Sequence, residues 1–304
     1  MRKALVAALA LLASAACSPG AGTAKAPAGA PRGAIIVASF DFAESELLSE
    51  LYATVLQYHG YPVRRAFNLG PREVIEPALQ QGRVDIVPEY LGSALSFVTL
   101  GKADVDARRA YLFRQLTHAF KKKGVDPLAL APAQDENGIV VSEATAARYN
   151  LRKVSDLKPV ASKLVFGGPA ECESRPFCLP GLERTYGLHF KKFEALDAGG
   201  PVTVSSLQSG LVDVGLLFTT DPNIVSNGFV LLRDDRGLQP PDNVVPVVSR
   251  KVLKEHGGGV VRLIDEVTRK LSTDTLRRLN VKVQVNGRSA SRVALQWLKG
   301  RGII

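Results

Sequence analysis

"LQQGRVDIVPEY" (residues 79–90) and "LQSGLVDVGLLF" (residues 207–218) share Leu, Gln, Gly, Val and Asp at matching positions, with a constant offset of 128 residues. In each stretch a helix is predicted to end at a glycine, Gly82 or Gly210, because glycine tolerates the left-handed backbone of a helix C-terminus. An apolar strand follows. The repeat predicts two lobes of similar construction, and a chance match over so short a stretch is the alternative.

Each repeated strand ends at an aromatic residue, Tyr90 in the first and Phe218 in the second. Open α/β sheets bind ligands beyond the carboxyl ends of their strands. We therefore expect Tyr90 and Phe218 to face each other across a cleft between the lobes.

Apolar runs of strand length alternate with segments of helical period along the rest of the chain. The runs are "AIIVASF", "VDIVP", "GIVVS", "KLVFG", "VDVGLLF" and "NVVPVVS". The clearest helices are predicted over 43–58, 71–81, 104–123 and 259–271. Strands that are apolar on both faces and alternate with helices favour an α/β architecture with mostly parallel sheets.

The N-terminus has the pattern of a secretory signal over residues 1–16, with Arg2 and Lys3 before an apolar run that is too short to span a membrane. Small residues precede Cys17 and resemble a lipoprotein cleavage box, although Ser14 stands where leucine is usual. We expect Cys17 to be acylated, an ordinary signal-peptidase site being the alternative. Residues 17–32 are rich in Pro, Gly and Ala and are expected to form a flexible tether.

The body that follows is too large for one ordinary core and suits two. With Cys17 acylated, Cys172 and Cys178 are left as a pair in an oxidising compartment, so we expect a disulfide between them. The loop they close is short, so the bond matters mainly because it holds a local shape.

The formal net charge falls from +10 to +8 once Arg2 and Lys3 leave with the signal. The basic residues are scattered, Lys121 to Lys123 forming the one run, and aromatic residues do not interleave with them as a nucleic-acid face requires. The charge indicates a solvated basic surface, or one close to anionic lipid headgroups, and no nucleic-acid partner.

Catalytic and cofactor motifs are absent from the sequence. It has no G-x-S-x-G elbow, no P-loop and no G-x-G-x-x-G, and none of its four histidines has a second ligand at metal-site spacing. We therefore predict no cofactor, no metal and no enzymatic activity, which leaves a binding protein as the simplest class. An enzyme on the same fold is the disfavoured alternative.

The first predicted strand, 34–39, runs into a helix at which Asp41 and Glu44 have the spacing of a capping box. The backbone N–H groups at this helix start are expected to point into the cleft, where they suit a ligand carboxylate or hydroxyl. An ordinary helix cap is the alternative.

Several segments, in order, resemble the extracytoplasmic substrate-binding components of ABC importers for glycine betaine, proline betaine, carnitine and choline. The segments are "SFDFAESELL", "GRVDIVPEYLGSAL", "RPFCLPGLERTYGL", "LLFTTDPNI" and "LRDDRGLQPPDNVVPVV". They cover residues 33 to about 300, which is the whole of the predicted mature body.

The resemblance implies the two-lobed periplasmic-binding-protein fold (type II), with two hinge crossovers and a ligand cleft between the lobes. It places lobe 1 at 33–132 plus 238–304 and lobe 2 at 133–237, with crossings near 131–136 and 232–242. It also implies a monomer that binds a small-molecule solute and hands it to ABC permease and ATPase subunits. With the lipid anchor, the protein would sit on the outer face of the cytoplasmic membrane or in the periplasm. A sensor or interaction lipoprotein that reuses the fold is the alternative.

The arginine of the family's R-P motif falls on Arg175, which the resemblance implies as the partner of a ligand carboxylate. A guanidinium suits this role through its planar fork of donors. Cys172 and Cys178 flank Arg175 and are expected to hold it in place before the ligand arrives. The alternative is an arginine on a solvated disulfide loop.

The family commonly encloses a quaternary ammonium in tyrosines, and here only part of that cage is kept. Tyr90 is retained, Phe218 keeps the ring without the hydroxyl, and Asn137 and Asp242 replace two aromatic walls. Phe40 stands where the family has a lysine. Polar groups at 137 and 242 suit hydroxyls or an ammonium bearing hydrogens, so a polyhydroxylated or aromatic solute is the alternative to a betaine or choline. The remaining candidate ligand-binding residues are Asp41, Phe42, Asp135 and Thr219.

Overall fold

The computed structural model describes residues 33–103 and 108–304. The predicted signal over 1–16, the acylation site Cys17 and the tether over 17–32 lie outside the described residues, as does the start of the helix predicted over 104–123. In the described ranges, no helix has both the length and the apolar character needed to cross a membrane.

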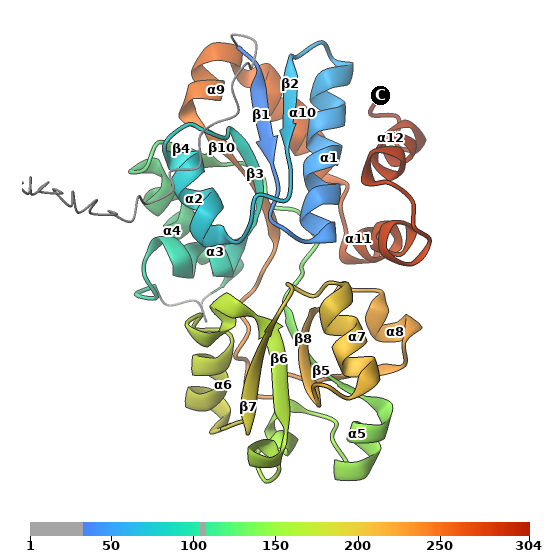
Figure 1. The fold of residues 1–304 in the computed structure, drawn as a ribbon. Coiled ribbons are helices and arrows are strands. Elements are labelled where there is room, and N and C mark those ends of the chain that lie inside the picture. The colour runs from blue at the N-terminus through green and yellow to red at the C-terminus, as the bar shows by residue number, and fades with distance from the viewer. Residues whose placement is uncertain (1–32, 104–107) are drawn as a thin grey trace, which may run out of the picture. The chain divides into compact units, whose positions relative to one another are not determined.

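The first sheet has the strand order β2-β1-β3-β10-β4 (Figure 1). β1 runs parallel to β2 and β3, whereas β10 runs antiparallel to β3 and β4. The strands are β1 (Ile35–Ala38), β2 (Val63–Ala66), β3 (Ile86–Tyr90), β4 (Val125–Pro127) and β10 (Val244–Ser249).

The second sheet has the matching order β7-β6-β8-β5-β9. β6 runs parallel to β7 and β8, and β5 runs antiparallel to β8 and β9. The strands are β5 (Asn137–Ser142), β6 (Val165–Pro169), β7 (Lys192–Leu196), β8 (Val214–Phe218) and β9 (Phe229–Leu232). The prediction of mostly parallel sheets is therefore wrong, because β5 and β10 each enter a sheet from the other lobe and run against their neighbours.

Helices cover both faces of the first sheet. Side chains of β10 alternate: Val244 and Val248 pack with α1, α10, α11 and α12, and Val245 and Val247 pack with α2, α3 and α4 on the opposite face (Figure 1). The helices are α1 (Ala43–Tyr58), α2 (Arg72–Gln80), α3 (Leu91–Val98), α4 (Arg109–Lys121), α9 (Arg250–His256), α10 (Gly258–Arg269), α11 (Thr273–Asn280) and α12 (Ala290–Gly300). The helices predicted over 43–58, 71–81 and 259–271 are thus confirmed to within two residues at each end.

The second sheet is covered by shorter helices. The α-helices are α5 (Glu143–Tyr149), α6 (Leu179–Tyr186), α7 (Pro201–Ser209) and α8 (Asn223–Ser226), and the 3₁₀ turns are Val154–Leu157, Ala161–Lys163 and Ala170–Glu173. Phe166 of β6 lies in one core cluster and Val140 of β5 in the other, so this sheet too is buried on both faces. The result is the two-lobed α/β fold that was predicted.

Two crossovers join the lobes. The chain leaves the first sheet after Pro127, enters the second at Asn137, leaves it after Leu232 and returns at Val244. The crossovers lie side by side, since Gln134 and Asn243 form an isolated antiparallel bridge. The lobe boundaries proposed from the sequence fall inside these segments, and their exact residues stay a prediction.

The sequence repeat has a physical basis in both lobes. Gly82 and Gly210 have positive φ angles of 66° and 72°, as a left-handed helix end requires. The carboxylate Oδ2 of Asp85 accepts a hydrogen bond of 2.9 Å from the backbone N–H of Ile36, and Oδ2 of Asp213 accepts one of 2.8 Å from Val165. Each aspartate therefore ties its strand to the start of the neighbouring parallel strand.

Candidate functional site

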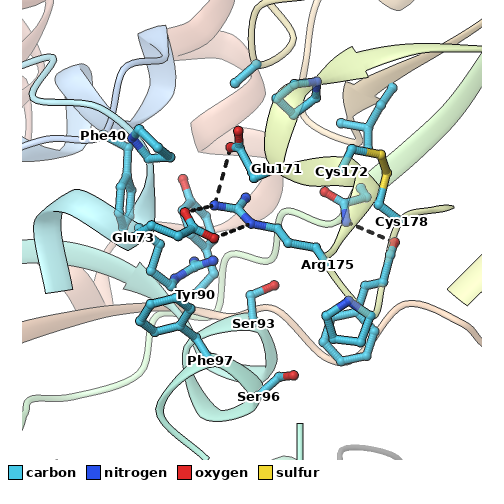
Figure 2. Close-up of a pocket in the computed structure, with 18 of the residues that line it drawn as sticks. Phe40, Glu73, Tyr90, Ser93, Ser96, Phe97, Glu171, Cys172, Arg175 and Cys178 are labelled. Carbon is cyan, nitrogen blue, oxygen red and sulfur yellow. Dashed lines mark hydrogen bonds and ion pairs between the residues drawn. A yellow bond between two sulfur atoms is a disulfide. The ribbon is translucent and has the colours of Figure 1, made fainter. Parts of the chain in front are cut away.

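A cavity of about 510 Å³ is lined by residues from both lobes (Figure 2). All of the predicted ligand-binding residues except Thr219 line it: Phe40, Asp41, Phe42, Tyr90, Asp135, Asn137, Arg175, Phe218 and Asp242. The structure thus brings together side chains from separate parts of the sequence at one hollow. Which of them contact a ligand stays a prediction.

Aromatic rings form one wall of the cavity. Phe42, the residue before α1, has its ring centroid 4.8 Å from that of Phe218 and 6.1 Å from that of Tyr90. Tyr90 ends β3 of the first sheet and Phe218 ends β8 of the second. Phe42 therefore connects the two rings that the repeat predicted to meet at the cleft.

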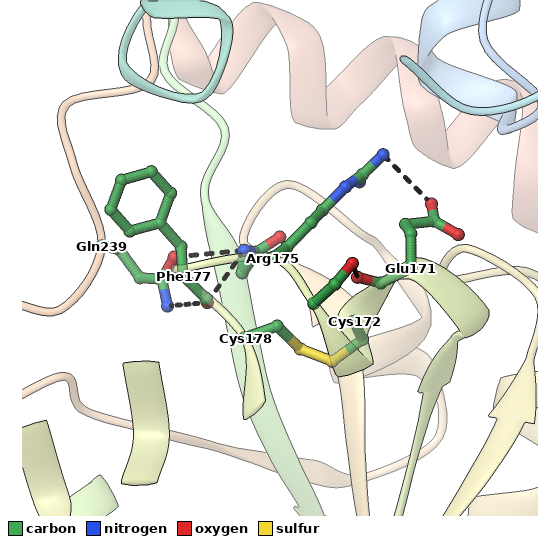
Figure 3. The surroundings of a disulfide bond; sticks show 8 residues. Glu171, Cys172, Arg175, Phe177, Cys178 and Gln239 are labelled. Atoms are coloured by element: carbon green, nitrogen blue, oxygen red, sulfur yellow. Dashed lines mark hydrogen bonds and ion pairs between the residues drawn. A yellow bond between two sulfur atoms is a disulfide. The ribbon is translucent and has the colours of Figure 1, made fainter. Parts of the chain in front are cut away.

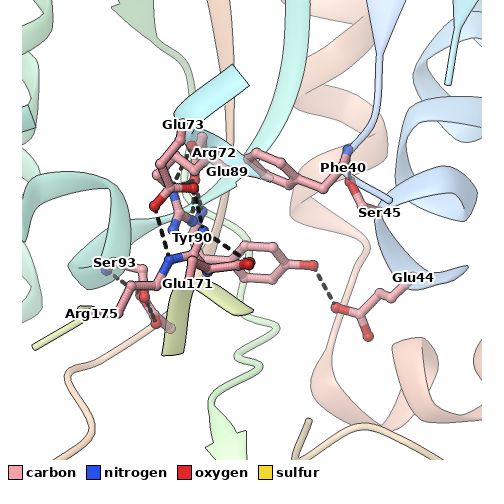
Figure 4. Close-up of polar contacts among 11 residues, drawn as sticks. Phe40, Glu44, Ser45, Arg72, Glu73, Glu89, Tyr90, Ser93, Glu171 and Arg175 are labelled. Atoms are coloured by element: carbon pink, nitrogen blue, oxygen red, sulfur yellow. Dashed lines mark hydrogen bonds and ion pairs between the residues drawn. The ribbon is translucent and has the colours of Figure 1, made fainter. Parts of the chain in front are cut away.

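Phe40 stacks on Phe42 of this wall, with ring centroids 6.0 Å apart, and faces a cation of the protein. The guanidinium carbon of Arg72 lies 5.3 Å from the centroid of Phe40, a distance at which cation and ring attract each other. Arg72 is buried and donates to Glu89, with Nε 2.9 Å from Oε1 and Nη2 2.8 Å from Oε2 (Figure 4). The positive charge of Arg72 is thus neutralised inside the protein, and one face of Phe40 is occupied.

Cys172 and Cys178 form the predicted disulfide, and Arg175 lies in the loop it closes (Figure 3). The backbone of this loop is turned tightly: the N–H of Arg175 donates to the carbonyl of Glu171, and the N–H of Cys178 donates to the carbonyl of Arg175, each at 3.0 Å. The loop is therefore held by backbone hydrogen bonds as well as by the covalent bond.

The side chain of Arg175 is engaged by carboxylates. Its Nη2 lies 2.8 Å from Oε2 of Glu73, its Nε lies 3.2 Å from Oε1 of the same residue, and Nη2 lies 3.3 Å from Oε1 of Glu171 (Figure 2). Glu73 belongs to α2 in the first lobe, so this ion pair joins the two lobes across the cavity.

Asn137 and Asp242, the two polar residues expected in place of aromatic walls, have partners within the protein. Nδ2 of Asn137 donates to Oε1 of Gln239 at 3.2 Å and to the carbonyl of Phe177 at 3.3 Å. Asp242 accepts from the N–H and hydroxyl of Ser93, at 2.8 and 2.6 Å, and so caps the start of α3. Burial raises the pKa of Asp242 to about 6. Both side chains therefore hydrogen-bond within the protein, whereas from the sequence they were expected to contact a ligand.

Asp135 and Thr219 lie together where the chain crosses between the lobes. Thr219 does not line the cavity; its hydroxyl donates to Oδ1 of Asp135 at 3.1 Å and accepts from the N–H of Glu136 at 3.0 Å. Burial raises the pKa of Asp135 well above its usual value, and the charge of Glu44 adds to the shift. Thr219 directly follows β8 and contacts the crossover residue Asp135 instead of lining the cavity.

The predicted capping box of Asp41 and Glu44 is wrong. No side chain caps α1, and Glu44 is buried, where it accepts hydrogen bonds from Tyr90 at 2.8 Å, from Asn280 at 2.6 Å and from Thr220. Burial raises the pKa of Glu44, and the hydrogen bonds that it accepts oppose the shift. Because Thr220 follows β8, Glu44 is a buried link between the lobes (Figure 4 shows its contact with Tyr90).

The residues that sequence reasoning missed are mostly charged or polar partners. Glu73 and Arg72 open α2, just beyond the end of β2, at the same sheet edge as Tyr90. Their position after β2, at the carboxyl edge of the first sheet, is the sequence feature that could have identified them as site residues. The other missed lining residues include Ser93, Ser96, Phe97, Glu171 and Phe177.

A second hollow of about 540 Å³ adjoins the first and shares Asp41, Phe42, Ala198 and Phe218 with it. Its described lining residues include Glu44, Asp197 and Asp221 and no lysine or arginine. The region around the aromatic wall is therefore acidic.

These features, two α/β lobes with paired crossovers and an aromatic cavity between them, agree with a match to known proteins. The family model described as "Substrate binding domain of ABC-type glycine betaine transport system" matches residues 33–300. The chain belongs to this family.

Several known proteins are similar in sequence or structure to most of this chain. The glycine betaine-binding protein YehZ of Escherichia coli (strain K12) is 29% identical over 275 residues, which are 85% of this chain and 88% of YehZ. The ergothioneine transport permease/ergothioneine binding protein EgtU of Helicobacter pylori (strain G27) is 25% identical over 283 residues, 90% of this chain but 49% of EgtU. A crystal structure named as a glycine betaine/carnitine/choline ABC transporter has a TM-score of 0.68 at 23% identity, covers 88% of this chain and 99% of its own, and shows the same fold.

Membership in the family settles the class of activity. Its members are non-catalytic, solute-binding parts of ABC importers, and they work with a transporter permease. The predictions of a binding protein and of the fold are confirmed by this match.

Proposed function

We propose that this chain binds a small compatible solute of the betaine or choline type in the cavity between its lobes and delivers it to the permease. The observation that carries the proposal is the aromatic wall of Phe42, Tyr90 and Phe218, which come from both lobes and line one cavity. A quaternary ammonium cannot donate hydrogen bonds, and aromatic faces attract it through their quadrupoles.

The polar contacts within the site favour this solute over a polyhydroxylated one. Hydrogen-bonding groups that would hold hydroxyls are taken up by the protein, Asn137 by Gln239 and Asp242 by Ser93. A polyol would have to share these groups with the protein, whereas a methylated ammonium needs only the ring faces.

Isothermal titration calorimetry with choline, glycine betaine, proline betaine, carnitine, ergothioneine and a sugar alcohol tests the proposal. We expect a quaternary ammonium compound to bind, and we expect Phe42→Ala to weaken its binding by about 5- to 30-fold, the effect of losing about 1–2 kcal/mol of cation–π attraction. Tyr111→Ala is the matched control, because Tyr111 is exposed on α4 and does not line the cavity. Binding of the sugar alcohol alone, or an unchanged affinity in Phe42→Ala, contradicts the proposal.

We also propose that the protein acts as a monomer, anchored by acylated Cys17 outside the cytoplasmic membrane and coupled to ABC permease and ATPase subunits. The cleavage-box pattern before Cys17 supports the anchor. Mass spectrometry of the protein extracted from membranes should find a lipid on Cys17, and Cys17→Ala should release the protein from the membrane fraction. An unmodified N-terminal peptide would contradict the anchor.

A further inference from the structure

The guanidinium of Arg175 is bound as a ligand carboxylate would bind it, but by a side chain of the protein. Glu73 meets it in a two-point arrangement, Nε with Oε1 and Nη2 with Oε2, and Glu171 adds a contact from the other side. Such paired contacts are the geometry in which arginine recognises carboxylates. One guanidinium against two carboxylates leaves this part of the cavity with a net negative charge.

A solute with a carboxylate would have to compete with Glu73 for Arg175. Displacing Glu73 would leave two carboxylates, its own and that of the solute, near one guanidinium. Burial acts to raise the pKa of Glu73, but the hydrogen bond and charge of Arg175 prevail and lower it, so Glu73 stays ionised in neutral solution. The competition is therefore between two anions, and one of them is already in place.

The other lining arginine offers no alternative anchor. Among the described residues that line the cavity, Arg72 and Arg175 are the basic ones, and Arg72 is paired with buried Glu89. Asp41 on the same lining and Asp197 of the adjoining hollow add to the negative charge. The aromatic faces and the charge both favour a cation.

We propose that the site selects a small quaternary ammonium ion that carries no carboxylate, of which choline is the probe, and that Glu73 determines this selectivity. This inference rests on the proposed function of the same cavity. Glu73 keeps Arg175 occupied and joins the lobes, while the cation lies against Phe42, Tyr90 and Phe218. Arg175 then helps to close the cleft, which differs from the expected role of a partner for a ligand carboxylate.

Calorimetry on the full-length protein compares the dissociation constants of choline and glycine betaine. We expect wild type to prefer choline by about tenfold or more, the effect of one charge-assisted hydrogen bond denied to the betaine. Glu73→Gln keeps the size of the side chain and removes its charge, so the preference should fall by about tenfold as Arg175 becomes available to the carboxylate. Glu266→Gln, the same change at an exposed position of α10 outside the cavity, should leave the preference unaltered.

A second measurement needs no variant. The methyl ester of glycine betaine has nearly the size of the acid but no carboxylate charge, so wild type should bind the ester about tenfold more tightly. Equal or tighter binding of glycine betaine than of choline and the ester would overturn the inference and leave the proposed function standing. An unchanged preference in Glu73→Gln would overturn the role of Glu73. Failure of wild type to bind any quaternary ammonium would overturn the proposed function itself.

Discussion

Replacing Arg72 by methionine is expected to destabilise the first lobe strongly. The substitution keeps an unbranched side chain but leaves the carboxylate of Glu89 fully buried without its ion partner. Glu76 is also buried, and burial together with the charge of Glu89 raises the pKa of its carboxyl group well above the usual value. Arg72 therefore compensates the charge of acidic groups that are buried in the protein.

Breaking a buried pair by removing one partner costs about 3–5 kcal/mol, because the remaining charge stays buried. We expect Arg72→Met to lower the free energy of unfolding by this amount. The double variant Arg72→Met/Glu89→Met should recover much of the loss, because replacing both partners by apolar groups is close to neutral. Arg269→Met is the control: its pair with Asp265 is exposed and should contribute less than about 1 kcal/mol.

The assay is urea unfolding followed by the fluorescence of Trp297, the one tryptophan of the sequence, which lies in the core of the same lobe. A loss below about 1 kcal/mol in Arg72→Met would refute the reasoning, since that is the contribution of a solvent-exposed pair. A double variant no more stable than the single one would also refute it, because the cost would then come from lost packing and not from an unpaired charge.

Three further predictions follow from individual contacts. The pKa of Asp242 is about 6, above its usual 3.8, so between these values the folded state keeps a proton that the unfolded state releases. The free energy of unfolding should therefore fall as the pH rises from about 4 to about 7. Urea unfolding across that range should show a fall about 3 kcal/mol smaller in Asp242→Asn than in wild type. Tyr90→Phe removes one hydrogen-bond donor to buried Glu44 and should lower the free energy of unfolding by about 1–2 kcal/mol. Because the aromatic ring remains, calorimetry should find the solute affinity nearly unchanged, and a large loss of affinity would contradict this. Replacing Cys172 and Cys178 by serine should cost about 2 kcal/mol and weaken solute binding, and thiol titration of the unfolded, non-reduced wild type should find both cysteines blocked; free thiols there would exclude the crosslink.

The sequence was sufficient for features that depend on local pattern. Apolar runs predicted the strands that end at Tyr90 and Phe218, and left-handed Gly82 and Gly210 follow from the repeat. The cavity lining was largely predictable because strand ends and helix starts gather at one edge of each sheet.

Features that depend on how distant segments meet were not predictable. Glu73 pairs with Arg175 across the cavity, and Asp242 caps α3 from a crossover remote in sequence. Glu44 looked like a local cap because its spacing to Asp41 fits one, but donors from three separate regions of the chain hold it. The direction of β5 and β10 likewise follows from the path of the crossovers, and the spacing of apolar residues in the sequence does not reveal it.

The repeated aspartates, Asp85 and Asp213, fix the entry of β3 and β8 into their sheets, while Tyr90 and Phe218 stand at the exits. In the proposed site, strand alignment and solute recognition therefore fall at opposite ends of each strand. Under that proposal, a substitution at the exit can alter which molecules are accepted without shifting the strand. The same division marks positions 90 and 218 as starting points for redesign, with the two aspartates left untouched.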